Sequence, residues 1–153
     1  MLLITVMLLA AVLFWFFTFP RTPRAASALD IATAYLTAVK TFDIGTQQRL
    51  STEDSKSAFL PPWLSILDAQ PAGAVSMQAD RAELPIDMMM AYTSANEQAP
   101  SESVRNALAR PYRLLLQLEH TSQGWRVDQA AFFHTVRQTL AIKNPTVVFP
   151  PWE

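Results

Sequence analysis

Few residues of this chain have the chemistry of a catalytic or metal-binding group. The 153 residues include no cysteine and two histidines, His120 and His134. The usual zinc sites combine Cys and His ligands, so one such chain cannot build them. The three glycines, Gly45, Gly73 and Gly124, do not form a phosphate-binding loop, and no Gly-x-Ser-x-Gly turn is present. The sequence therefore predicts no catalytic residue of these classes, no metal and no cofactor.

The charge balance argues against nucleic acid as a partner. The 12 basic and 13 acidic residues nearly cancel, and the formal net charge is −1 at pH 7. No stripe of Lys and Arg is present that would bind phosphates. All of these charges follow residue 20, in a stretch long enough to bury the core of one domain.

The elements that position the remaining residues begin with an apolar N-terminal segment. Residues 1–19 contain no charge, glycine or proline, and the run stops at Pro20. A helix of that length spans about 28 Å, close to the hydrocarbon thickness of a bilayer. We predict a transmembrane anchor over residues 1–20, with the lipid bilayer as partner, and a linker over 21–26. A cleaved signal peptide is the alternative, because Ala26-Ser27-Ala28 is a small-x-small sequence.

The first part of the domain has helical periodicity. Over residues 27–43 the apolar residues recur every three or four positions, and Ser27 can cap the start of the helix. Gly45 supplies a residue able to take a positive φ just beyond the end. A short helix is predicted over 52–59, followed by another apolar turn or helix over 63–67. The expected apolar stripe of the first helix consists of Leu29, Ala32, Tyr35, Leu36, Val39 and Phe42.

From residue 74 onward the period changes to two. Alternation at 74–78 is followed by a strand over 82–92 and a second strand over 112–119, which a loop ending at Gly124 connects to a returning strand. Pro85 cannot donate a ladder hydrogen bond, so its strand is expected at an edge there or bulged. Residues 102–109 favour helical turns. Residues 130–143 fit a helix, with a strand through Phe132-Phe133 as the alternative.

This order predicts an α+β domain over residues 27–144, in which a helix packs on a curved antiparallel sheet. The runs ALDIATAYLTAVKTFD, ADRAELPIDMMMAY and RPYRLLLQLEHTSQGWRVD resemble the nuclear transport factor 2-like (cystatin-like) superfamily. The resemblance covers residues 27–133 and implies a cone-shaped sheet around the N-terminal helix. Behind one span, such a domain resembles the inner-membrane scaffold subunits of conjugative type IV secretion systems. A departure from those subunits is expected, because they commonly carry a cytoplasmic N-terminal tail, whereas the apolar run here starts at Met1.

The resemblance also implies that the inside of the cone can serve as a pocket, where carboxylate, tyrosine or histidine groups transfer protons. Tyr35, Asp87 and His134 are the residues of these types here. Alternation places Asp87 on the face opposite Ile86 and Met88, outside the cone, and Tyr35 is typical of a core tyrosine. The chain is therefore expected not to be an enzyme. A small-ligand-binding or proton-transfer module that uses the cone cavity is the alternative.

Two features favour binding to other proteins. In the tail, residues 145–153, Phe149 and Trp152 flank Pro150-Pro151, and the prolines hold the aromatic groups in a stiff segment suited to a partner's groove. The same tail can equally fold back on its own domain. Met89 lies on the polar face of its strand, where exposure would mark a contact surface and coverage by the C-terminal segment would mean packing.

The predicted function is that of a single-span structural subunit, whose domain contacts other membrane or envelope proteins in an oligomeric assembly such as a secretion or conjugation machine. Arg21 and Arg24 follow the span and by the positive-inside rule favour a cytoplasmic domain. The absence of cysteine and the family resemblance favour export. We expect a single-pass protein of the inner membrane with a periplasmic domain.

Overall fold

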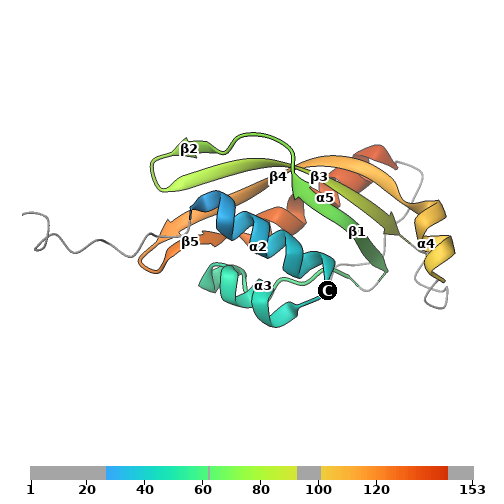
Figure 1. Cartoon of the computed structure of the whole chain (residues 1–153), viewed down its shortest axis with the longest axis horizontal. Helices are drawn as coiled ribbons and strands as arrows, with labels where there is room; N and C mark the ends of the chain where they lie inside the picture. The colour runs from blue at the N-terminus through green and yellow to red at the C-terminus, as the bar shows by residue number, and fades with distance from the viewer. Residues whose placement is uncertain (1–26, 62, 93–100, 145–153) are drawn as a thin grey trace, which may run out of the picture.

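The computed structural model describes residues 27–61, 63–92 and 101–144. These residues form an α+β fold, with helices packed on a curved five-stranded antiparallel sheet (Figure 1). The predicted anchor, linker and tail, including Phe149, Pro150, Pro151 and Trp152, lie outside the described residues. Within the described ranges, every helix is too short or too polar to cross a bilayer.

Helix α2 (Ala28–Lys40) confirms the predicted N-terminal helix and its cap. The Asp30 N–H donates to the Ser27 hydroxyl at 3.2 Å, and the Ser27 N–H donates to the Asp30 carboxylate at 3.1 Å. This capping box satisfies backbone donors that the first turn leaves free. The ends of the predicted stripe were wrong, because Leu29 and Phe42 are 43% and 57% exposed.

The turn after α2 comes earlier than the sequence indicated. Phe42, and not Gly45, adopts a positive φ of 55°. The Asp43 N–H donates to the Ala38 carbonyl at 2.9 Å, which closes the helix before Gly45 is reached. Gly45 instead lies inside the next helix, α3 (Ile44–Leu50).

Residues 44–58 differ most from the prediction. Helix α3 was not foreseen, and one 3₁₀ turn, η1 (Glu53–Ser55), stands where a helix over 52–59 was expected. Ser51 ends α3 and bridges Val127, and the Thr52 N–H donates to the Val127 carbonyl at 2.9 Å. This pairing with a distant strand holds the backbone of Ser51 and Thr52 extended at the point where the helix was expected to begin.

Strand β1 (Leu64–Pro71) corrects the turn or helix expected over 63–67. It pairs with β3, and the register shifts between Ile66 and Asp68. The extra residue of this bulge breaks the alternation, so that buried Leu64 and Ile66 are followed by buried Ala69 three positions later. The expected turn or helix was based on Trp63, Leu64, Ile66 and Leu67, whose spacings of three are also typical of a helix.

Strands β3 (Arg81–Tyr92) and β4 (Arg110–Thr121) confirm the two long predicted strands and form the centre of the sheet. The order is β1-β3-β4-β5, with β5 (Gly124–Val127) after the turn at Gly124, and β2 (Ser76–Gln78) pairs with the start of β3. We call the buried side of β3 and β4 the inner face: Ala82, Leu84, Ile86, Met88, Met90, Tyr112, Leu114, Leu116 and Leu118. The other side is the outer face: Glu83, Pro85, Asp87, Met89, Pro111, Arg113, Leu115, Gln117 and Glu119.

Pro85 lies in a central strand, but at a local gap in the pairing. On one side it opposes Leu115 of β4; on the other, the β2 pairing ends at Glu83 and the β1 pairing begins at Ile86. The Ala72 N–H donates to the Pro85 carbonyl at 2.8 Å on that second side. Because the N–H and C=O of a strand residue point the same way, the donor that proline lacks is missing where no strand requires it.

Helices α2 and α5 (Gln129–Lys143) cover the inner face (Figure 1). The ring of Phe132 on α5 meets that of Tyr35 on α2 edge-on, with centroids 6.0 Å apart. The helical interpretation of residues 130–143 is thus confirmed, as are the helical turns before β4, which form α4 (Glu102–Leu108). The inner side is filled by buried side chains from both layers, including Tyr35, Leu36, Leu84, Met88, Leu116, Phe132, Val136 and Leu140.

Candidate functional site

The three residues of proton-transfer type are not brought together. Tyr35 is buried between α2 and α5, with no exposed surface. Asp87 lies on the outer face, as alternation predicted, and its side chain is 45% exposed. His134 is on the exposed side of α5. Because the sheet separates Tyr35 from Asp87, these residues do not share a site.

Tyr35 has the role of a core tyrosine. Its hydroxyl donates to the Gln129 Oε1 at 2.9 Å. Burial raises the pKa of Tyr35 far above its ordinary value, and the negative charge of Asp128 raises it further. The hydroxyl therefore stays protonated and acts as a hydrogen-bond donor to a neutral amide.

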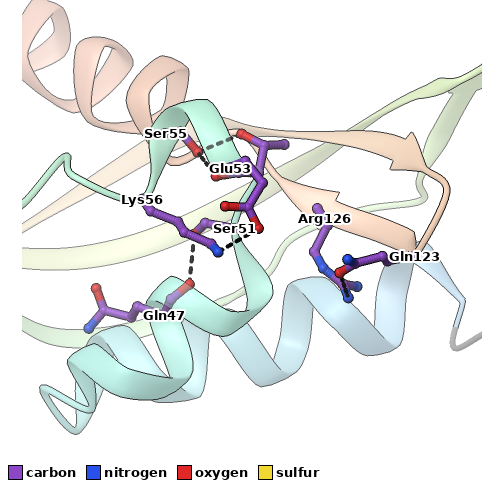
Figure 2. Close-up of polar contacts among 8 residues, drawn as sticks. Gln47, Ser51, Glu53, Ser55, Lys56, Gln123 and Arg126 are labelled. Carbon is purple, nitrogen blue, oxygen red and sulfur yellow. Dashed lines mark hydrogen bonds and ion pairs between the residues drawn. The ribbon is translucent and has the colours of Figure 1, made fainter.

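Gln129 is the centre of a buried polar cluster that fastens residues 47–58 to α5. Its Nε2 donates to the Ala58 carbonyl, and its backbone N–H donates to the Ser55 hydroxyl at 3.1 Å. The Ser51 hydroxyl has two acceptors within reach, the Gln129 Oε1 at 3.0 Å and the Gln47 carbonyl at 2.7 Å; Figure 2 shows the contact with Gln47. Every polar group in this cluster has a partner, which indicates a structural role.

The outer face carries a different arrangement. Three cross-strand pairs follow one another along β3 and β4: Pro85 with Leu115, Asp87 with Arg113, and Met89 with Pro111. An ion pair is thus flanked by apolar side chains on both sides. Leu115 is 43% exposed, and the exposed apolar area of such a surface is available for contact with another molecule.

The ion pair at the centre of this surface is bidentate. The Arg113 Nε donates to Asp87 Oδ1 at 2.8 Å, and its Nη2 donates to Oδ2 at 3.0 Å. These hydrogen bonds, helped by the positive charge, hold the pKa of Asp87 below its ordinary value, and the same contacts raise the pKa of Arg113. Both groups are charged at neutral pH and hold each other in a fixed geometry.

A groove crosses the outer face over β1, β3 and β4. Its volume is about 430 Å³. Asp68 lies at its β1 side, where its Oδ1 forms an ion pair with the Lys40 Nζ at 2.7 Å. Both carboxylates in the groove are therefore paired. The groove is lined by Asp68, Gln70, Asp87, Met88, Met89, Pro111, Tyr112 and Arg113.

Met89 lies in this groove and is half-buried. Its predicted place on the side opposite Met88 and Met90 is confirmed, whereas its role in binding stays a prediction. Leu115 was missed, although a signal was present in the sequence. It is the middle residue of an apolar triplet, as Met89 is, and alternation places the middle residue of such a triplet on the polar face.

A second depression lies where β2, β3 and β4 meet. Its volume is about 180 Å³, and it is lined mainly by polar residues, among them Arg81, Glu83, Glu119 and Asp128. Arg81 pairs with Glu119 at 3.4 Å. In the part of the chain that the structure describes, no three His, Cys, Asp or Glu side chains are grouped so that they could hold a metal ion.

Comparison with known proteins gives only distant structural similarity. No protein-family model matches the chain, and no curated protein matches it. Among solved structures, the chain is similar to an LEH-like epoxide hydrolase of M. tuberculosis, with 12% sequence identity and a TM-score of 0.44. The match covers 81% of this chain and 100% of that chain. A similarity of this size assigns neither a fold family nor an activity to this chain.

Proposed function

We propose that this chain is a non-catalytic, membrane-anchored structural subunit, and that its α+β domain binds other proteins of a cell-envelope assembly through the outer face of its sheet. The observation that carries the proposal is the surface made by Met89, Pro111 and Leu115 around the Asp87–Arg113 ion pair. Exposed apolar area beside an Arg side chain is typical of protein-binding surfaces.

The state of the inner face supports this proposal over the small-ligand alternative. A ligand-binding or proton-transfer module would need its pocket between the sheet and the helices. Tyr35, Leu116 and Phe132 occupy that space and have no exposed surface. The hydroxyl of Tyr35, the one titratable group among them, is already bonded to Gln129.

The proposed mechanism depends on confinement to a membrane. An anchor over residues 1–20 would confine the domain to the plane of the membrane. Confinement raises the effective concentration of the domain near its partners, so that weak binding is enough for assembly. We propose the inner membrane as the location and the periplasm as the side of the domain. A secretion or conjugation machine is the kind of assembly that such a subunit fits.

The anchor and its orientation are tested together by protease protection of sealed vesicles. A periplasmic domain is digested in intact spheroplasts and protected in inverted vesicles. The opposite pattern would place the domain in the cytoplasm and reject the secretion-scaffold proposal. Recovery of a freely soluble chain that begins near Leu29 would reject the anchor.

The binding surface is tested by cross-linking the full chain in the membranes of the cells that produce it. The variant Leu115→Glu places a charge in the apolar surface and should lower the yield of cross-linked partners at least about tenfold, the loss expected at the centre of an interface. Ile142→Glu is the matched control, since Ile142 is an exposed apolar residue (76%) on α5. Equal yields from the two variants would reject the outer face as the binding surface.

A further inference from the structure

The end of helix α5 is held against the inner face of the sheet, at the level of the groove on the outer face. Asn144, the residue that ends α5, accepts a hydrogen bond from the Tyr92 hydroxyl at 3.2 Å. Its Nδ2 contacts the Tyr112 hydroxyl at 3.4 Å and donates to the Leu140 carbonyl at 3.0 Å. Tyr112 also lines the groove, opposite Met88. Asn144 therefore lies on the inner side of β3 and β4, at the level where their outer side carries the groove.

The groove is open, and its charges are already paired. Met89 and Pro111 supply apolar surface on neighbouring strands. Asp68 is paired with Lys40 and Asp87 with Arg113. An apolar occupant would therefore cover no unpaired carboxylate, which removes the main cost of burying charged groups.

The segment that follows Asn144 has the composition and reach of such an occupant. Residues 145–153 read PTVVFPPWE, with two aromatic residues and three prolines. Trp152 is eight residues beyond Asn144, a separation that extended chain spans over about 25 Å. Met89 is three residues, about 10 Å, from Tyr92 at the end of β3. The segment is therefore long enough to pass that end from the inner to the outer side of the sheet and reach Met89.

We propose that residues 145–153 occupy the outer-face groove of their own chain, with Phe149 and Trp152 packed on Met89 and Pro111. The proposed attachment is by side-chain packing, because the thioether of Met89 suits contact with an aromatic ring. A partner that uses the outer face must then displace the segment; this last consequence rests on the proposed function.

Disulfide trapping in the purified full chain tests the contact. The natural chain has no cysteine, so the pair Met89→Cys and Trp152→Cys adds the only two thiols. On mild oxidation this pair should form an intramolecular disulfide in monomeric chains. The control pair, Met77→Cys with Trp152→Cys, should not, because Met77 opposes Ala82 on the far half of β3, about 23 Å from Met89 along the strand.

Labelling kinetics provide a second readout that needs no contact with Trp152. Maleimide should modify Met89→Cys about tenfold more slowly in the full chain than in the chain that lacks residues 145–153, which corresponds to a groove occupied about 90% of the time. Met77→Cys, exposed in both chains, should label at one rate.

Two results overturn this proposal. Equal labelling rates of Met89→Cys with and without residues 145–153 would mean that the segment does not cover the groove. Disulfides found only between chains would assign the segment to the groove of a second copy. Both measurements use the purified chain alone, so their failure would leave the proposed binding of envelope proteins to be judged by the Leu115→Glu experiment.

Discussion

The two faces of the central strands differ although their residues alternate along the same backbone. Met88 is 2% exposed and packs in the core, whereas Met89 lies half-buried in the outer groove. Likewise Leu116 has no exposed surface, and Leu115 is 43% exposed. One step along the strand thus separates a residue that stabilises the fold from a residue available for binding.

Polar groups on the two faces are stabilised in different ways. On the inner side, neutral groups around Gln129 satisfy one another away from water. On the outer side, Asp87 and Arg113 keep their charges and remain partly solvated. A neutral cluster avoids the cost of burying charge, but the loss of one member leaves a buried polar group without a partner and lowers stability. An exposed ion pair contributes little to stability. We therefore assign stability to the inner face and propose recognition as the role of the outer face.

The largest effect should come from removing the centre of the buried cluster. Gln129→Leu leaves the Tyr35 hydroxyl and the Ala58 carbonyl without partners and should lower the free energy of unfolding by about 4 kcal/mol. Urea denaturation followed by circular dichroism measures the change. Gln138→Leu, the same substitution on the exposed side of α5, should change it by less than about 0.5 kcal/mol. Equal losses of stability in Gln129→Leu and Gln138→Leu would contradict a structural role for the cluster.

The next largest effect on the free energy of unfolding should distinguish Met88 from Met89. Met88→Ala leaves a cavity in the core and should cost about 3 kcal/mol, whereas Met89→Ala should cost less than about 1 kcal/mol. Both values come from denaturant titrations of the full chain in detergent. In cross-linking, the order should reverse, with Met89→Ala losing more partner than a folded Met88→Ala chain. A destabilisation by Met89→Ala as large as that by Met88→Ala would show that the two faces share one role.

A smaller effect is expected when one donor of the cluster is lost. Tyr35→Phe removes the hydroxyl but leaves the Gln129 Oε1 within reach of the Ser51 hydroxyl, so the loss should be about 1 kcal/mol. Tyr112→Phe is the control, because the contact of the Tyr112 hydroxyl with Asn144 is long, at 3.4 Å. A loss from Tyr35→Phe as large as that from Gln129→Leu would mean that Ser51 does not compensate.

The smallest effect concerns the outer ion pair and depends on pH. Because the pKa of Asp87 is lower in the folded chain than in the unfolded chain, its contribution is present above the unfolded pKa of about 3.9. The contribution is lost as the pH falls through the lower, folded value. The denaturation midpoints of the natural chain and of Asp87→Asn should therefore differ slightly at pH 6 and converge near pH 2. A difference that grows on acidification would contradict this assignment.

Prediction from the sequence worked best where local rules and tertiary packing agree. The alternation through Leu84, Ile86 and Met88 predicted β3 because the buried face of a strand repeats every two residues. The capping box at Ser27 is equally local. Prediction failed over residues 44–71, where a bulge at Ile66 and the bridge from Ser51 to Val127 replace local preferences by contacts between distant residues.

The candidate site was predictable only in part. Met89 was recognised from the triplet in which it lies, and Asp87 was correctly placed outside the core. Its partner Arg113 is 26 residues away in the sequence, and Asp68 reaches the groove from a strand that was not predicted. Such groups meet only through strand register, to which no short sequence pattern corresponds.

The sequence by itself determined the α+β class, the two long strands and the side on which each of their residues lies, because these follow from backbone geometry repeated along the chain. Only the tertiary structure decided that the inner side is filled, that Gln129 joins α2, α5 and residues 51–58, and that Asp87 and Arg113 meet beside an open groove. These features depend on which distant segments pack together, and packing is decided by the shapes and partners of many residues at once.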